Sequence, residues 1–208
     1  MRVISAVVMA GLLALSGPAL ARPPQTAAKH ATTPRSVEAP PLTRLPQWAV
    51  PEYYDLAIKS DPDKADFSGT VTIAVDLKKA ANHVWLHGKD LKVSSVAITD
   101  AHGKTHTGKY DGAVTPEAEK AGVARVDFGR TLQPQEIKLK FEFTAPYNAT
   151  LQGYYKVVFA GNAYLQTQME PISARLAFPC FDEPGFKAPL TLSLTIPDAD
   201  KAVANAPQ

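Results

Sequence analysis

The sequence contains one cysteine among 208 residues, and it contains no glycine-rich phosphate loop, nucleophile elbow or arginine cluster. A single cysteine excludes an intrachain disulfide framework. Its neighbours Phe178 and Phe181 indicate that Cys180 is a small buried apolar residue rather than a catalytic thiol. The 22 basic and 20 acidic residues nearly balance, so the composition gives no sign of nucleic-acid binding or of attachment to an anionic membrane.

The N-terminus also lacks an apolar run long enough to cross a membrane. Residues 3–15 are apolar, but they are fewer than the roughly 20 residues that a spanning helix needs. Arg2 precedes the run and Ala19-Leu20-Ala21 follows it, which is the pattern of an export signal cleaved before Arg22. No cysteine directly follows the cleavage point, which argues against a lipoprotein. We therefore predict a signal peptide over residues 1–21 and an exported chain, periplasmic or secreted, without a permanent membrane anchor.

Proline is concentrated near the N-terminus, where seven of the eighteen prolines lie between Pro23 and Pro51. Residues 22–46 have no apolar period, which predicts a flexible, proline-rich linker. From residue 47 the apolar residues recur with a period of two, so 47–208 is predicted to be one β domain. A turn at 197–200 leads into another possible strand at 202–205, so we expect this domain to be incomplete at its C-terminal end.

Alternating apolar and polar residues predict three strong strands, at residues 67–77, 137–144 and 190–196, each with one buried face and one face in water. Weaker strand candidates are residues 53–59, 84–86, 91–98, 123–128 and 154–159. Within 91–98 the apolar set slips between Val93 and Val96, which predicts a β-bulge. No segment has the pattern of an amphipathic helix, and residues 117–121 allow one turn at most. The predicted fold class is all-β: an antiparallel, saddle-like β-sandwich or one large twisted sheet.

Two histidine pairs have the i, i+4 spacing of a zinc-binding helix: His83 with His87, and His102 with His106. That motif also needs a helix and a glutamate directly after the first histidine, and neither pair has them. In an extended strand His83 and His87 would lie about 13 Å apart, too far to share one zinc ion. The sequence therefore predicts no metal site in this chain.

Asp182 and Glu183 are adjacent carboxylates, a pattern that can suggest acid–base catalysis. Adjacent residues of an extended chain point to opposite faces, so this pair cannot flank one bond. We predict instead a polar turn before Pro184, in which the two carboxylates accept backbone hydrogen bonds or pair with Arg175 or Lys187.

Glu170 has a different setting, because it follows the polar residues Gln166, Thr167 and Gln168 in an otherwise apolar stretch. A carboxylate among partly buried amides can receive an ammonium group through charge-assisted hydrogen bonds. Alternatively, Glu170 pairs with Arg175 and has a structural role. The residues by themselves leave both interpretations open.

Residues 166–188 are apolar without a strand or helix period, which predicts a buried irregular segment that positions side chains. This segment resembles the signature of the zinc aminopeptidases of the aminopeptidase N type, a family that includes the leukotriene hydrolases. Its part Phe178-Pro179-Cys180-Phe181-Asp182-Glu183-Pro184 is a highly specific match. Residues 50–56, 67–73, 84–91 and 151–155 resemble the same family, so the resemblance runs from about residue 46 to the end.

The resemblance implies that the chain is the N-terminal domain of an exported zinc aminopeptidase, which removes N-terminal residues from peptides. Glu170 would bind the α-ammonium of a peptide with a free N-terminus, and Gln168 would help to line the pocket for its first residue. Zinc would be bound in a C-terminal catalytic domain that this chain lacks. No catalytic residue and no zinc ligand is expected here, so this chain alone should be inactive. Met169 and Ile172 depart from the common family pattern, so no side-chain preference is predicted.

A second interpretation is a free-standing, exported β-sandwich that binds a peptide or another protein without catalysis. A stop codon directly after Gln208 would favour this binding module. An open reading frame that encodes a zinc helix would favour the aminopeptidase.

Overall fold

A computed structural model of the protein describes residues 38–205. The predicted signal peptide and the first part of the predicted linker, residues 1–37, lie outside the described residues. Leu45, near the end of the predicted linker, is 2% exposed, and its N–H donates to Glu183 Oε1 at 2.5 Å. Within the described residues, no helix is both long and apolar enough to span a membrane.

Strands make up most of the described residues and confirm the predicted all-β class. In chain order they are β1 (Ala49–Lys59), β2 (Asp66–Leu77), β3 (Ala81–His87), β4 (Lys92–Thr99), β5 (Thr105–Thr107), β6 (Lys109–Asp111), β7 (Val123–Leu132), β8 (Gln135–Pro146), β9 (Gly153–Phe159), β10 (Asn162–Gln168) and β11 (Leu190–Thr195). The two helical segments among residues 38–205 are α1 (Pro116–Ala121) and a 3₁₀ turn, η1 (Ala174–Leu176).

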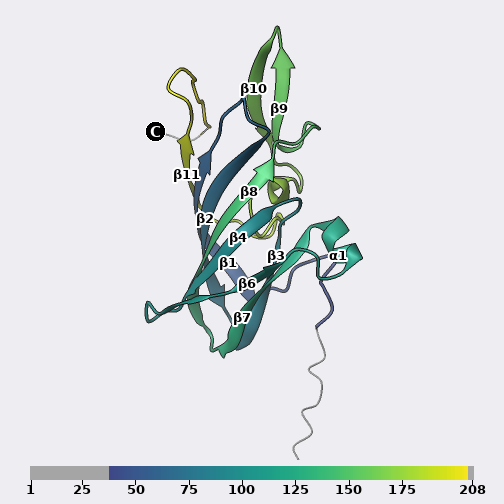
Figure 1. Ribbon diagram of the computed structural model, residues 1–208. Coiled ribbons are helices and arrows are strands. Elements are labelled where there is room, and N and C mark those ends of the chain that lie inside the picture. Colours follow the sequence, from purple (N-terminus) through teal and green to yellow (C-terminus); the bar gives the residue numbers. More distant parts are fainter. Residues whose placement is uncertain (1–37, 206–208) are drawn as a thin grey trace, which may run out of the picture. The chain divides into compact units, whose positions relative to one another are not determined.

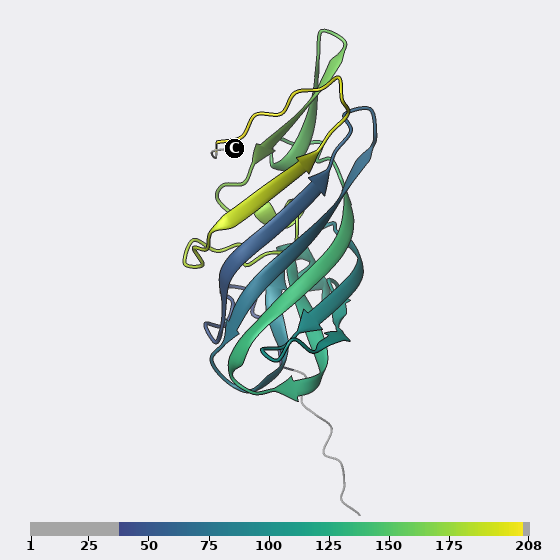
Figure 2. The same cartoon turned by 90° about the vertical axis from the view of Figure 1, so that its left-hand side faces the viewer.

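The strands form three sheets (Figures 1 and 2). The large sheet has the order β11-β1-β2-β8-β4-β5 and is antiparallel except for the parallel pair of β1 and β11. The sheet β3-β7-β6 lies behind it in Figure 2, and the buried apolar residues of both sheets form one core. β9 and β10 form a separate hairpin that extends past the end of the large sheet in both views.

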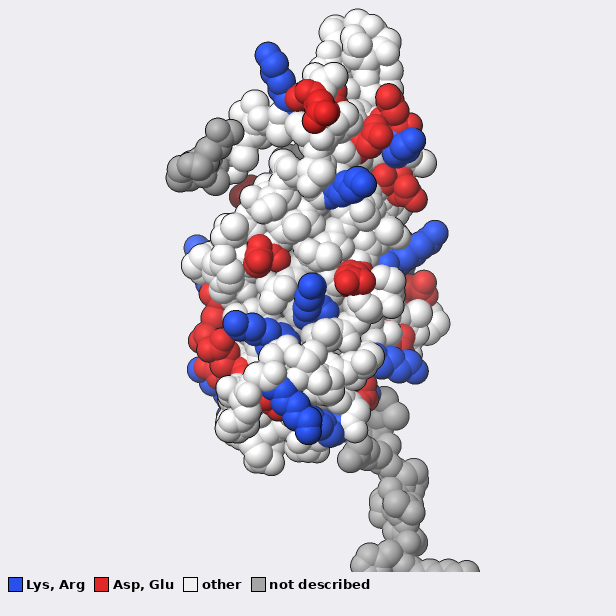
Figure 3. Space-filling view, turned by 60° about the vertical axis from the view of Figure 1, so that its left-hand side comes forward, with Lys and Arg blue, Asp and Glu red and all other residues white. Residues whose placement is uncertain are grey.

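The predicted alternation decides which face of the large sheet is buried. The residues of β8 that face the core are Ile137, Leu139, Phe141 and Phe143. Basic and acidic side chains are spread over the outer face of this sheet, which Figure 3 shows obliquely. The predicted bulge within residues 91–98 is confirmed, because the register of β4 against β8 shifts between Val93 and Ser95.

Two strands differ from the expectation. The predicted strand at 190–196 forms as β11, but all of its residues are exposed, so the predicted burial of one face is wrong for this chain. β10 was not predicted: Gln166 to Gln168 were expected in a buried irregular segment, yet they are exposed and pair with β9. Backbone pairing in this hairpin needs no apolar period, which is why the pattern did not reveal the strand. Within the described residues, 201–205 form no strand.

Gly69 of β2 lies where the core leaves no room for a side chain. A Cβ at this position would lie 2.8 Å from Phe143 Cζ and 2.9 Å from the carbonyl oxygen of Ala57. The backbone contact cannot relax without moving β1. Overpacking of this kind costs about 1–3 kcal/mol, so Gly69→Ala should lower the free energy of unfolding by that amount in urea titrations.

The neighbouring Thr70→Ala variant is the matched control, because Thr70 belongs to the same strand but points to the opposite face. It should change the free energy of unfolding by less than about 1 kcal/mol. Equal effects of the two substitutions would contradict the steric account.

Candidate functional site

An open pocket of about 490 Å³ lies beside the irregular segment that follows β10. Its lining comes from three parts of the chain: Tyr54 of β1, the segment between Glu170 and Ala188, and Leu190 of β11. Glu170 is therefore at the pocket, next to an apolar wall that includes Phe178 and Phe186. A carboxylate beside an apolar wall suits a ligand that carries both a cationic group and an apolar side chain.

The two residues predicted to bind substrate are close together, and both are exposed, not partly buried as expected. Gln168 ends β10, and its Oε1 accepts a hydrogen bond from the N–H of Glu170 at 3.2 Å. Gln168 itself does not line the pocket. Its amide holds the backbone that carries the Glu170 carboxylate.

The base of the β9–β10 hairpin is fixed to the large sheet by polar and aromatic contacts. The Tyr154 hydroxyl donates to Ser60 Oγ at 2.7 Å, and Lys156 Nζ donates to the carbonyl of Pro62 at 2.7 Å. The ring of Tyr154 lies edge-on to Phe67, with centroids 4.9 Å apart. Glu170 thus follows β10, whose partner strand β9 is fixed to Phe67 and to the segment after β1.

Arg175 is buried, and each of its three side-chain nitrogens donates a hydrogen bond. Its Nε donates to Asp182 Oδ2 at 2.9 Å, its Nη1 to the carbonyl of Ala121 at 2.6 Å, and its Nη2 to the carbonyl of Asp182 at 3.0 Å. The sequence left open whether Arg175 pairs with Glu170 or with Asp182, and the structure decides for Asp182. None of the ion pairs among residues 38–205 includes Glu170.

The polar turn predicted for Asp182 and Glu183 is confirmed. Asp182 accepts from the backbone N–H of Arg175 at 3.2 Å in addition to the side-chain ion pair. Glu183 accepts from the N–H of Leu45, and so fixes the chain that enters β1. Both carboxylates thus hold the backbone in place. Among the described residues that line the pocket, Glu170 is the carboxylate without such a hydrogen bond or ion pair to its side chain.

His87, at the end of β3, supports the same segment. Its N–H donates to the carbonyl of Cys180 at 2.7 Å, and the N–H of Cys180 donates back at 2.9 Å. Nδ1 of His87 accepts from the N–H of Asp182 at 3.1 Å, so this nitrogen carries no proton. Burial, with a smaller effect of Arg175, lowers the pKa of His87 from 6.5 to about 3, and the ring is neutral at pH 7.

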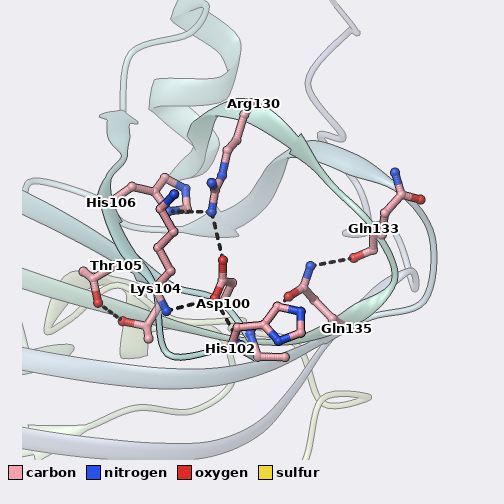
Figure 4. Close-up of polar contacts among 10 residues, drawn as sticks. Asp100, His102, Lys104, Thr105, His106, Arg130, Gln133 and Gln135 are labelled. Carbon is pink, nitrogen blue, oxygen red and sulfur yellow. Dashed lines mark hydrogen bonds and ion pairs between the residues drawn. The ribbon is translucent and has the colours of Figure 1, made fainter.

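The histidine pairs do not form a zinc site. His83 and His87 both lie on β3, where Nδ1 of His83 contacts Asn82 Oδ1 at 2.8 Å and Nδ1 of His87 accepts from Asp182. Figure 4 shows the other pair: Arg130 reaches Asp100 and His106, while the ring of His102 lies apart from His106. Residues 38–205 bring no three histidine, cysteine, aspartate or glutamate side chains together, so their donors do not fit a zinc ion.

Sequence reasoning did not foresee the walls of the pocket. Tyr54 lies far from Glu170 in the sequence, and its hydroxyl accepts from the N–H of Phe181 at 3.0 Å. Leu190 was predicted to be a core residue of a strand, yet it is exposed and lines the pocket. No local pattern connects these residues, because β11 lies beside β1 only through the order of the sheet, and the pocket brings both strands together with the irregular segment.

The model of the peptidase M1 N-terminal domain family matches residues 50–208. The chain belongs to this family. The match includes all of the pocket residues, and it confirms the family that the sequence resembled.

Curated relatives of this M1 domain are aminopeptidases. Aminopeptidase M1-A of Oryza sativa subsp. japonica is 32% identical over 170 residues, which are 79% of this chain and 19% of the relative. Glutamyl aminopeptidase of Homo sapiens is 30% identical over 175 residues, 79% of this chain and 18% of the relative. Puromycin-sensitive aminopeptidase of Caenorhabditis elegans is 29% identical over 170 residues, which are 78% of this chain and 17% of the relative. The chain thus spans less than a fifth of the length of these relatives.

The neutral His87 makes the stability of the M1 domain depend on pH. Its pKa is lower in the folded than in the unfolded chain, so the unfolded chain binds more protons between pH 6.5 and about 3. The contribution of His87 is complete above pH 6.5 and is lost as the pH falls through this range. From pH 8 to pH 5 the parent should lose about 2 kcal/mol of unfolding free energy through His87.

His87→Asn is the test variant, because an asparagine side chain can offer an acceptor near Nδ1 but does not titrate. Other groups, including His83, whose pKa burial also lowers, titrate in both proteins. The difference between parent and variant in urea titrations at pH 8 and pH 5 therefore isolates His87. If the difference in unfolding free energy between parent and variant were the same at both pH values, the conclusion that His87 is neutral and accepts a hydrogen bond would be contradicted.

Proposed function

We propose that this chain is the substrate-anchoring N-terminal domain of an exported zinc metallo-aminopeptidase. The proposal rests on one observation. The Glu170 carboxylate lies at the pocket of an M1 domain and takes part in none of the ion pairs among residues 38–205. Arg175, which could have neutralised it, is committed to Asp182. A peptide ammonium is the cation that this arrangement fits.

Anchoring of the amino group explains how such an enzyme would be restricted to the first peptide bond. The ammonium of a free N-terminus would bind Glu170 through charge-assisted hydrogen bonds, and the first side chain would lie along the apolar wall. Gln168 would hold Glu170 in position through its hydrogen bond to the backbone. A peptide with a blocked N-terminus would lack the charge that Glu170 recognises.

Hydrolysis itself requires groups from outside the described residues. Zinc would be bound by another part of the polypeptide, since residues 38–205 hold no fitting set of ligands. The curated relatives are more than five times as long as the region that they share with this chain, which supports a separate catalytic domain. The chain alone would bind substrate weakly and would not cleave it.

Export is part of the same proposal and rests on residues 1–21, which have the composition of a cleavable signal. In the exporting host, the mature chain should begin within a few residues of Arg22, without a permanent membrane anchor. Mass spectrometry of the exported protein checks this. Intact Met1 on exported protein would contradict it.

In the full-length enzyme, Glu170→Ala should impair peptide hydrolysis much more than folding. A hydrogen bond to a charged group is worth about 1.5–3 kcal/mol, so kcat/KM should fall roughly tenfold to a hundredfold. Part of the loss should appear in kcat, because an unanchored peptide presents its first bond in poor register. Steady-state kinetics on a free-amine peptide and on its N-acetylated form measure both effects, and the acetylated form should lose nothing further.

Two controls accompany this measurement. Glu142→Ala removes a carboxylate from the exposed outer face of β8 and should leave the kinetics at the parental level. The 208-residue chain alone should bind no stoichiometric zinc and release no product from the same peptide. If Glu170→Ala kept the parental kcat/KM, the proposed anchoring role would be contradicted. If the 208-residue chain alone hydrolysed the peptide, the assignment of catalysis to another domain would be contradicted.

A further inference from the structure

The loop of residues 151–155, which resembles a motif of the family, contains a glycine that has no room for a side chain. Gly153 is the first residue of β9 and is buried. A Cβ at this position would lie 2.7 Å from Cβ of Leu176 and 3.2 Å from the carbonyl oxygen of Ser173. The φ of Gly153 is 66°, a left-handed conformation that residues with a side chain disfavour. The start of β9 therefore touches η1 more closely than a residue with a side chain would allow.

Gly153 also lies opposite the residue that supports Glu170. In the ladder of the hairpin, Gly153 pairs with Gln168, the last residue of β10. The side chain of Gln168 accepts the hydrogen bond from the N–H of Glu170. Gly153 thus lies beside the chain on both sides of Glu170, next to Gln168 before it and next to Ser173 after it.

The chain between these two points forms a turn that backbone hydrogen bonds close. The N–H of Ser173 donates to the carbonyl of Met169 at 2.8 Å, and the carbonyl of Ser173 accepts from the N–H of Leu176 at 3.2 Å. This carbonyl oxygen is the one that an added Cβ at Gly153 would approach. Residues 170–172, inside the turn, are exposed. The place of the carboxylate in this turn therefore depends on how closely Ser173 and η1 pack against β9.

Both partners of this contact are held by other bonds. Tyr154, directly after Gly153, donates from its hydroxyl to Ser60 Oγ at 2.7 Å. η1 contains Arg175, which is fixed by its buried ion pair. A side chain at position 153 would therefore displace the exposed turn between them more readily than β9 or η1.

We propose that Gly153 is a positioning residue of the amine site. Because Gly153 has no side chain, the turn that carries Glu170 closes against β9 and holds the carboxylate at the pocket. This inference rests on the proposed function of Glu170. It gives the motif at residues 151–155 a role in substrate recognition, although Gly153 itself does not line the pocket.

Steady-state kinetics of the full-length enzyme test this inference with Gly153→Ala. On a free-amine peptide kcat/KM should fall roughly tenfold to a hundredfold, because a displacement of about 1 Å at an anchoring group can have an effect of this size. On the N-acetylated peptide, which has no ammonium for Glu170, kcat/KM should stay within about twofold of the parent. Losses of equal size on both peptides would overturn the proposal, because a destabilised domain without a positioning defect would give them. Parental kinetics on both peptides would also overturn it.

Gly161→Ala is the matched control. Gly161 lies in the turn between β9 and β10, its φ is 81°, and an added Cβ would meet no atom within 4 Å. Both variants place an alanine in the left-handed conformation, but the Cβ of Gly153→Ala also meets η1. Gly161→Ala should therefore keep the parental kinetics on both peptides. Equal kinetic effects of the two variants would contradict the steric role of Gly153.

Leu176→Ala tests the same contact from the side of η1. Cδ1 of Leu176 lies 3.5 Å from the position of the added Cβ, and the side chain is half-buried, so this variant decides the matter if Gly153→Ala does not fold. It should lower kcat/KM on the free-amine peptide about threefold or more and leave the acetylated peptide within about twofold of the parent. The same change on both peptides, or none, would count against the proposal.

The double variant Gly153→Ala/Glu170→Ala separates this inference from the proposed function. If Gly153 acts through Glu170, the double variant should hydrolyse the free-amine peptide within about twofold of Glu170→Ala alone. Additive losses would overturn the positioning role and leave the role of Glu170 intact. Parental kcat/KM in Glu170→Ala would contradict the proposed function, and this inference with it.

Discussion

The buried ion pair between Arg175 and Asp182 is the contact on which the candidate site depends. Burying a guanidinium costs several kcal/mol unless it is paired and its donors are satisfied. Here three nitrogens of Arg175 donate to Asp182 and to the carbonyl of Ala121. Those bonds join η1, the segment after Phe181 and the end of α1 in one network. They also keep Arg175 away from Glu170, whose charge stays available to a ligand.

The second sheet extends this network into the core. His87 ends β3 and exchanges two backbone hydrogen bonds with Cys180, while its ring accepts from Asp182. Glu183, the next residue, binds the N–H of Leu45 and so ties the chain before β1 to the same turn. The irregular segment is therefore held from both sheets and from the N-terminal side, although it has no regular structure of its own. Rigidity of this kind is what a site for a small cationic group needs.

Much of the sheet structure could be predicted from the sequence, because it follows from local alternation. β2 and β8 form where apolar and polar residues alternate, and even the bulge in β4 is visible as a slip in that pattern. The exposure of both faces of β11 could not be predicted, since alternation shows which face is apolar but not whether another segment covers it. The choice between Asp182 and Glu170 as partner of Arg175 depends on how an irregular segment folds back on itself. Periodicity has no information about such a segment.

The resemblance to a known family gave information about the irregular segment that the period of its apolar residues could not give. The residues between Phe178 and Pro184 pointed to an M1 domain, and the family match over residues 50–208 confirms it. What the structure adds to the proposal is a difference between the three carboxylates at the pocket: Asp182 and Glu183 each have a structural partner, and Glu170 takes part in none of the ion pairs among residues 38–205.

A structure of the full-length enzyme with a bound dipeptide tests the central claim most directly, namely that Glu170 receives the amino terminus. The account predicts the α-ammonium nitrogen at about 2.7–2.9 Å from a carboxylate oxygen of Glu170, with Arg175 still paired to Asp182. An ammonium bound elsewhere, or Glu170 paired with Arg175, would contradict it.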